Sequence, residues 1–86
     1  MKMKDIFEIE TIDDQQFMVC LDSTVLAGMI QLNETAAFIV ACLKEETTAE
    51  EIAGKKAATY DVSQKEALSG VEQIIAQLRQ LNALEG

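Results

Sequence analysis

Histidine, proline and tryptophan are absent from the 86 residues, and the chain contains only two cysteines. Histidine has its ordinary pKa nearest neutral pH, so the commonest general base and a common zinc ligand are both missing. Cys20 and Cys42 are far apart and not at a metal-ligand spacing. Both are expected to be small buried hydrophobic residues. The sequence therefore predicts no catalysis, no metal and no other cofactor.

The carboxylates likewise form no recognisable catalytic pair. They occur as adjacent pairs, Asp13-Asp14, Glu45-Glu46 and Glu50-Glu51, at predicted turns or helix starts. Solvated caps and turns are the ordinary explanation for such pairs, because short polar side chains bond to nearby backbone amides. No glycine-rich phosphate-binding loop is present either. Binding is thus a better hypothesis than enzymatic chemistry.

Basic residues are scarce, since 7 lysines and arginines stand against 15 acidic residues for a formal net charge of −8. Such a chain repels a phosphate backbone, which makes nucleic acid a poor partner and a basic peptide or enzyme surface a better one. No apolar run approaches the roughly 20 residues of a membrane span. The first residues, MKMKDIFE, do not resemble a signal peptide, so we expect a cytoplasmic protein without membrane contact.

The segment 32–43, LNETAAFIVACL, is the centre of the predicted fold. Asn33 is a good N-cap because its side-chain oxygen accepts a backbone N–H that the first turn leaves unpaired. Glu34 places negative charge where the helix dipole favours it. From Ala36 to Leu43 the sequence is apolar without a break, which predicts a helix at about 33–44 that is buried on most of its circumference.

Three strands are predicted before this helix, at about residues 6–12, 17–21 and 25–32. In the first, Phe7 and Ile9 alternate with acidic residues, which is typical of a half-buried strand facing a core. In the second, Phe17, Val19 and Leu21 share one face. Short polar connections join the strands, so we expect an antiparallel meander.

Two helices are predicted after the central one, at about residues 49–59 and 64–81. Thr48 with Glu51, and Ser63 with Glu66, form two possible capping boxes. In the second of these helices Leu68, Val71, Ile75 and Leu78 recur at helical spacing, and Ile74 and Leu81 widen the stripe. The six positions span about 140°, more than one core contact requires. The helix either covers the sheet and the central helix together, or also contacts a partner.

The expected fold is therefore a single α+β domain covering residues 1–86, a three-stranded antiparallel sheet followed by three helices. The last two helices form a helix-turn-helix-like pair, and a hairpin beside such a pair is the winged-helix layout. The third strand, whose firm part is Met29–Leu32, is expected at a sheet edge. An unpaired edge can accept a peptide strand, or it can pair with the edge of a second copy to form a homodimer.

The ordered set LNETAAFIVACL, TTAEEIA, Tyr60-Asp61-Val62-Ser63 and the final helix resembles the PqqD family, coenzyme PQQ synthesis protein D and its relatives. The resemblance spans about residues 7–84, and Leu-Asn-Glu-Thr at 32–35 is its most specific part. It implies a winged-helix domain that binds the leader of a ribosomally made precursor peptide as an added strand. It also implies presentation of that peptide to a radical S-adenosylmethionine (SAM) maturase.

The resemblance also implies where the peptide lies, between the third strand and the third helix. Carried onto this sequence, the peptide-binding residues are Met29, Ile30, Gln31, Leu32, Val71, Ile74, Ile75 and Leu78.

Three alternatives remain open at this point. A winged-helix DNA-binding protein is disfavoured by the acidic charge and because the last helix carries only Lys65 and Arg79 as basic residues. A carrier protein modified at Ser23 is suggested by the Asp-Ser dipeptide alone. An interaction domain with another protein partner is the least specific alternative.

Overall fold

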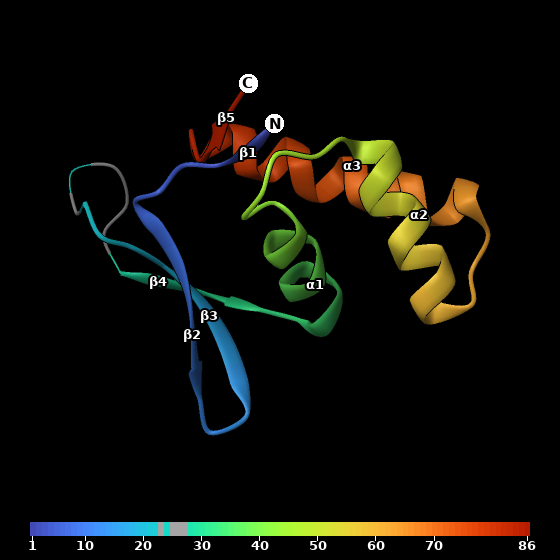
Figure 1. The fold of residues 1–86 in the computed structure, drawn as a ribbon. Helices are drawn as coiled ribbons and strands as arrows, with labels where there is room; N and C mark the ends of the chain where they lie inside the picture. The colour runs from blue at the N-terminus through green and yellow to red at the C-terminus, as the bar shows by residue number, and fades with distance from the viewer. Residues whose placement is uncertain (23, 25–27) are drawn as a thin grey trace.

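The computed structural model describes residues 1–22, 24 and 28–86. Its elements, in chain order, are β1 (Lys2–Met3), β2 (Phe7–Ile12), β3 (Gln15–Cys20), β4 (Met29–Leu32), α1 (Glu34–Cys42), α2 (Ala49–Tyr60), α3 (Gln64–Gln80) and β5 (Leu84–Glu85). Figure 1 shows all three helices to one side of the larger sheet, with α1 nearest to it.

The main sheet is an antiparallel meander with the order β2-β3-β4. This confirms the predicted α+β fold, in which three strands precede three helices. Opposite residues include Phe7 with Cys20, and Met18 with Ile30. The third predicted strand began at residue 25; its described part is β4, and residues 25–27 lie outside the described chain.

The turn between β2 and β3 contains only two residues, Asp13 and Asp14. Both have positive φ, 52° and 64°, and the residues on either side, Ile12 and Gln15, are directly paired. A two-residue loop with both φ values positive is the type I′ turn, whose twist matches that of the flanking strands. Gln15 and Gln16, which sequence analysis placed in the turn, therefore belong to β3.

Replacing Asp14 by glycine should raise the free energy of unfolding by up to about 1 kcal/mol, because the left-handed backbone region is costly for a residue with a Cβ. Urea denaturation measures this change. Glu10→Gly in the extended β2 strand is the control and should lower stability instead. A destabilised Asp14→Gly variant would show that the aspartate side chain contributes more to the turn than its backbone costs.

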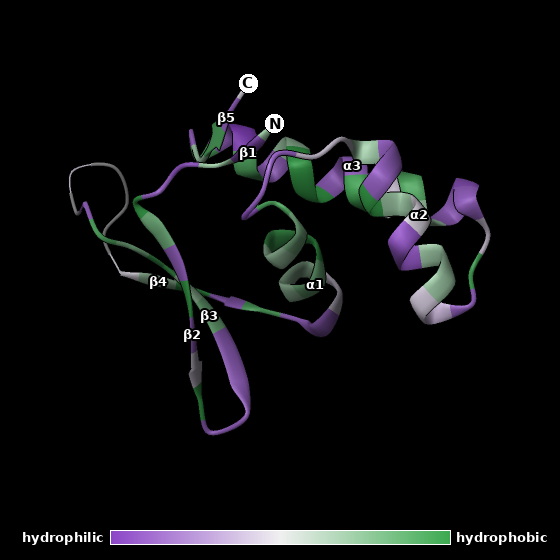
Figure 2. Ribbon diagram, in the orientation of Figure 1, coloured by the Kyte–Doolittle hydropathy of each residue, from purple (hydrophilic) through white to green (hydrophobic). Residues whose placement is uncertain are grey.

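Helix α1 is the centre of the fold, as predicted. Asn33 caps it by accepting the backbone N–H of Ala36 on Oδ1 at 2.7 Å. Ile39 and Leu43 are completely buried, at 0% exposure. Figure 2 shows apolar colouring along most of α1 and hydrophilic colouring at the β2–β3 hairpin tip. The unbroken apolar sequence thus reflects burial against both the sheet and the other helices.

Helices α2 and α3 begin at the predicted caps. Thr48 Oγ1 accepts from Glu51 N at 3.2 Å, and Ser63 Oγ accepts from Glu66 N at 3.1 Å. The Glu51 carboxylate accepts a hydrogen bond from Thr47 Oγ1 at 3.4 Å. Helix α2 ends at Tyr60, because the next residue, Asp61, has a left-handed backbone (φ 54°, ψ 47°) that stops the helix.

A second, two-stranded sheet joins the ends of the chain, and sequence analysis did not predict it. Strand β1 pairs antiparallel with β5. Two further backbone hydrogen bonds hold the N-terminal segment: Met3 N donates to Leu43 O at 2.7 Å, and Lys4 N donates to Ala83 O at 2.9 Å. These bonds attach the N-terminal segment to the end of α1 and to the segment after α3. Because each strand has two residues, neither produces a periodic sequence pattern.

No helix in the described ranges is long and apolar enough to cross a membrane.

Candidate functional site

Strand β4 forms an edge of the sheet. Within the described residues it pairs with β3 alone, from Met29 opposite Val19 to Leu32 opposite Gln16. In an antiparallel pair, alternate residues direct their backbone N–H and C=O groups toward the neighbouring strand and away from it. The side of β4 away from β3 thus presents backbone donors and acceptors to which a further strand can bond.

The four predicted β4 residues face in two directions. Ile30 and Leu32 are half-buried and pack against the core. Met29 and Gln31 are exposed, and Gln31 Nε2 donates to Gln15 Oε1 at 2.8 Å. The strand is held at its end by the Asn33 cap, because α1 begins directly after it. The β4 backbone is therefore held in place in two ways, by the packing of Ile30 and Leu32 and by the Asn33 cap, before any strand is added to it.

The four predicted helix residues are divided differently by the structure. Val71, Ile75 and Leu78 lie in the core, at 0%, 8% and 4% exposure. Ile74 is half-buried and packs against the same core from the flank of α3. Three of these four residues thus form a packing surface, and Ile74 is the accessible one among the four.

Leu81, directly after α3, is also half-buried and packed against the core. It lies seven residues beyond Ile74, two helical turns along the same flank. Sequence analysis placed Leu81 in the wide stripe but not in the site. The position of Leu81 at the edge of that stripe is the sequence feature that could have placed it in the site.

Helix α1 connects the two parts of the candidate site. It packs against β4 on one side and against α3 on the other, and it lies between them in Figure 1. The half-buried side chains Ile30, Leu32, Ile74 and Leu81 all rest on the core that α1 anchors. The apolar side chains of the β4 edge and those on the half-buried flank of α3 therefore pack against the same core.

A hollow of about 340 Å³ lies at the end of β4 that leads into α1. Its lining comes from the hairpin and from the β4–α1 junction: Asp14, Gln15, Gln16, Gln31, Leu32, Asn33, Glu34 and Ala37. Six of these eight residues carry an amide or a carboxylate side chain. The hollow therefore suits a polar or positively charged group at one end of a strand lying along β4.

A protein-family model matches most of the chain. The sequence model of the family described as "Coenzyme PQQ synthesis protein D (PqqD)" matches residues 18–84. The chain belongs to the PqqD family. The match includes β4, α1, α2 and α3, and therefore all eight residues predicted to bind the peptide. It does not include β2 or the hairpin turn.

Two solved structures have the same fold as this PqqD-family chain. One is described as "TbiB1 in Complex with the TbiA(beta) Leader Peptide"; it is 24% identical, covers 100% of this chain and 96% of its own, and has a TM-score of 0.81. The other, "Lasso peptide synthetase B1 complexed with the leader peptide", is 20% identical, covers 92% and 89%, and has a TM-score of 0.74. No curated protein matches the sequence.

Within the described residues of this PqqD-family chain, no three His, Cys, Asp or Glu side chains are grouped so that they could hold a metal ion. Both cysteines are free and half-buried, so they are less buried than sequence analysis predicted. Cys20 Sγ donates to the backbone oxygen of Asp22 at 3.2 Å.

The possible carrier serine, Ser23, lies outside the described residues. Its neighbour Asp22 is described: the hydroxyl and the backbone N–H of Thr24 both donate to Asp22 Oδ1, at 2.6 and 2.9 Å. These two hydrogen bonds lower the pKa of Asp22 below its ordinary value of 3.8, and the bond from the Thr24 hydroxyl has the larger effect. A carboxylate that accepts two hydrogen bonds is stabilised in its charged form.

Thr24→Ala removes the hydroxyl donor and should raise the pKa of Asp22 toward 3.8. In the unaltered chain the folded pKa lies below the unfolded one. The carboxylate therefore favours folding above the unfolded pKa, and this contribution is lost as pH falls through the folded pKa. An NMR titration of the Asp22 carboxyl carbon measures the shift. Thr24→Ser keeps a hydroxyl and should leave the pKa low; equal titration of both variants would contradict the assignment.

Proposed function

We propose that this chain binds the leader segment of a ribosomally synthesised precursor peptide as a strand added to β4. The proposal rests on two features of the described residues: the β4 edge has no strand paired to it there, and half-buried apolar side chains on β4 and α3 pack against one core. Membership of the PqqD family supports it. So does the fold shared with two proteins whose structures are described as leader-peptide complexes.

The binding energy would come from two sources. Each main-chain hydrogen bond to the added strand contributes about 0.5–1.5 kcal/mol net, and does not depend on the leader's side chains. Discrimination among peptides would come from pockets that receive alternate side chains of the leader. Ile30, Leu32 and Ile74 are the accessible apolar groups for this role, while Val71, Ile75 and Leu78 would support them from the core.

The proposed role is not catalytic: the chain would hold the leader in the cytoplasm and present the precursor to a radical SAM maturase. The sequence has no histidine, and the described residues contain no candidate metal cluster. A DNA-binding role is less well supported, because α3 has two basic residues and one of them, Arg79, donates from Nη1 to Gly86 O at 3.1 Å.

An NMR titration of the labelled chain with a leader from a precursor encoded nearby tests the proposal. Amide shifts should concentrate in Met29–Leu32 and along α3, because an added strand changes the hydrogen bonding of the β4 backbone. A scrambled leader of the same composition is the control. Shifts confined to the acidic turn Asp13-Asp14 would indicate nonspecific charge attraction and would contradict strand addition.

A further inference from the structure

The face of the main sheet opposite α1, here called the outer face, exposes large apolar side chains. The large hydrophobic residues that are clearly exposed in the described chain are Leu21 (65%), Met29 (55%) and Ile12 (47%). Met29 and Ile12 lie in the sheet, and Leu21 directly follows β3. Soluble domains commonly expose single apolar residues, but a contiguous group of them indicates an interaction surface.

The strand register shows that these residues share one face. Val19 is opposite both Glu8 and Met29, and Phe17 is opposite both Glu10 and Gln31. Directly opposite residues point to the same side of a sheet. The other side carries buried Met18 and Phe7, which belong to the core. The outer face therefore has an apolar centre on β3, extended to Met29 on β4 and Ile12 on β2.

Acidic residues border this apolar centre. Glu8 and Glu10 lie beside it on β2, both exposed, and Asp13-Asp14 form the adjoining hairpin tip. The strands β2, β3 and β4 contain no lysine or arginine. Among the residues that the structure describes, all three helices lie on the opposite side of the sheet (Figure 1).

We infer that the outer face is a second docking surface, which binds a basic amphipathic segment of a partner protein. Apolar side chains of such a segment would cover Phe17, Val19 and Met29, and its lysines or arginines would meet Glu8 and Glu10. A second copy of the chain fits less well, because it would bring two acidic faces and two net charges of −8 together. An anionic membrane is disfavoured for the same reason.

This surface is distinct from the edge to which the leader would add, but it adjoins it through Met29. Successive side chains of a strand point to opposite faces, so alternate residues of a strand added to β4 would emerge on the outer face beside Met29 and Gln31. A partner docked there would contact the chain and the leader together. This partner would be the maturase, an assignment that rests on the function proposed above.

The test uses a synthetic amphipathic helix of leucine and lysine as the probe, with a leucine and glutamate helix as its control. In a methyl-labelled sample, the Leu/Lys probe should shift the methyl signals of Ile12, Val19 and Met29, whereas buried Met18 should shift little. The Leu/Glu helix should shift none of them. Shifts centred on Ile30, Leu32 and Ile74 would place the probe in the leader site and overturn the inference.

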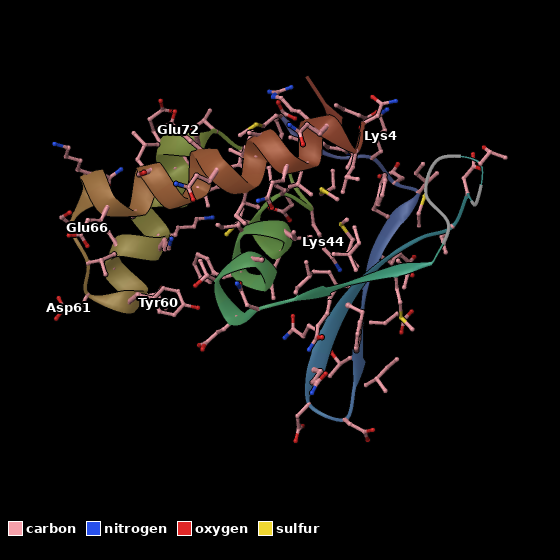
Figure 3. The ribbon with its side chains drawn as sticks, turned by 180° about the vertical axis from the view of Figure 1, so that it is seen from behind. Lys4, Lys44, Tyr60, Asp61, Glu66 and Glu72 are labelled. Atoms are coloured by element: carbon pink, nitrogen blue, oxygen red, sulfur yellow. The ribbon has the colours of Figure 1, made fainter. Side chains whose placement is uncertain are left out.

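Charge-reversal variants show whether the Leu/Lys probe is attracted by the acidic residues of the outer face or by the net charge of the whole chain. Glu8→Lys with Glu10→Lys should weaken binding of the Leu/Lys probe about fivefold to tenfold, as expected for losing two charge pairs. Glu45→Lys with Glu72→Lys makes the same change in net charge at exposed positions away from the sheet; Glu72 is labelled on α3 in Figure 3. Equal weakening by both double variants would overturn the inference.

Measuring leader binding as well distinguishes failure of the outer-face proposal from failure of the proposed function. The Glu8 and Glu10 variant should keep its affinity for the leader, because the proposed leader site lies at β4 and α3. Failure of the probe experiment with intact leader binding would eliminate only the outer-face surface. Failure of leader binding in the unaltered chain would eliminate the proposed function and leave the outer-face result standing.

Discussion

Replacing Ile39 by alanine is expected to lower the free energy of unfolding by about 2–5 kcal/mol. Ile39 is completely buried in α1 and belongs to the one core cluster that also includes Met18, Ile52 and Val71. Truncation removes buried methyl groups and leaves a cavity that rigid neighbours on three elements cannot fill. In a domain of 86 residues such a loss is a large part of the total stability.

Urea denaturation followed by circular dichroism measures this effect. Ala41→Ser, at an exposed position of the same helix, is the matched control and should stay within about 0.5 kcal/mol of the unaltered chain. A loss below about 1 kcal/mol for Ile39→Ala would contradict the placement of α1 at the centre of the core.

Replacing Ile74 by aspartate is expected to weaken leader binding by at least about tenfold, the equivalent of 1.4 kcal/mol. Ile74 is the half-buried residue on the flank of α3, so an apolar leader side chain placed there would face a carboxylate in its pocket. Burying an unpaired charge is costly. Calorimetric titration with the leader measures the loss.

Gln73→Asp is the matched control for this variant. It introduces the same side chain one residue earlier, at an exposed position on a different face of α3. Its leader affinity should change by less than about threefold, the equivalent of 0.6 kcal/mol. Thermal unfolding must show both variants folded at the temperature of the titration. Equal affinities of folded Ile74→Asp and the unaltered chain would remove Ile74 from the site.

Local sequence signals were sufficient for the three helices. Asn33, Thr48 and Ser63 each accept the predicted N-cap hydrogen bond, because a capping side chain needs only the backbone of its own first turn. The unbroken apolar sequence of α1 predicted its burial for a similar reason. The contacts that β1 and β5 make are between opposite ends of the chain, and two-residue strands carry no local signal.

The candidate site was predictable only in outline. Periodicity placed Val71, Ile74, Ile75 and Leu78 on one stripe, but the same period describes a core face and a binding face. Only the packing of α1 and α2 against α3 separates buried Val71 from half-buried Ile74. The same limit applied to Phe17 and Val19: alternation placed them on one face, and the register showed that this is the outer one.

The central claim is that this PqqD-family chain binds a leader peptide at β4. Calorimetric titration of the purified chain with the leader of a short precursor encoded nearby tests it most directly. We expect saturable binding with a Kd of about 1 μM or lower, which corresponds to a binding free energy of about −8 kcal/mol or stronger. Absence of binding at high peptide concentration, by a chain shown to be folded and monomeric, would contradict the account.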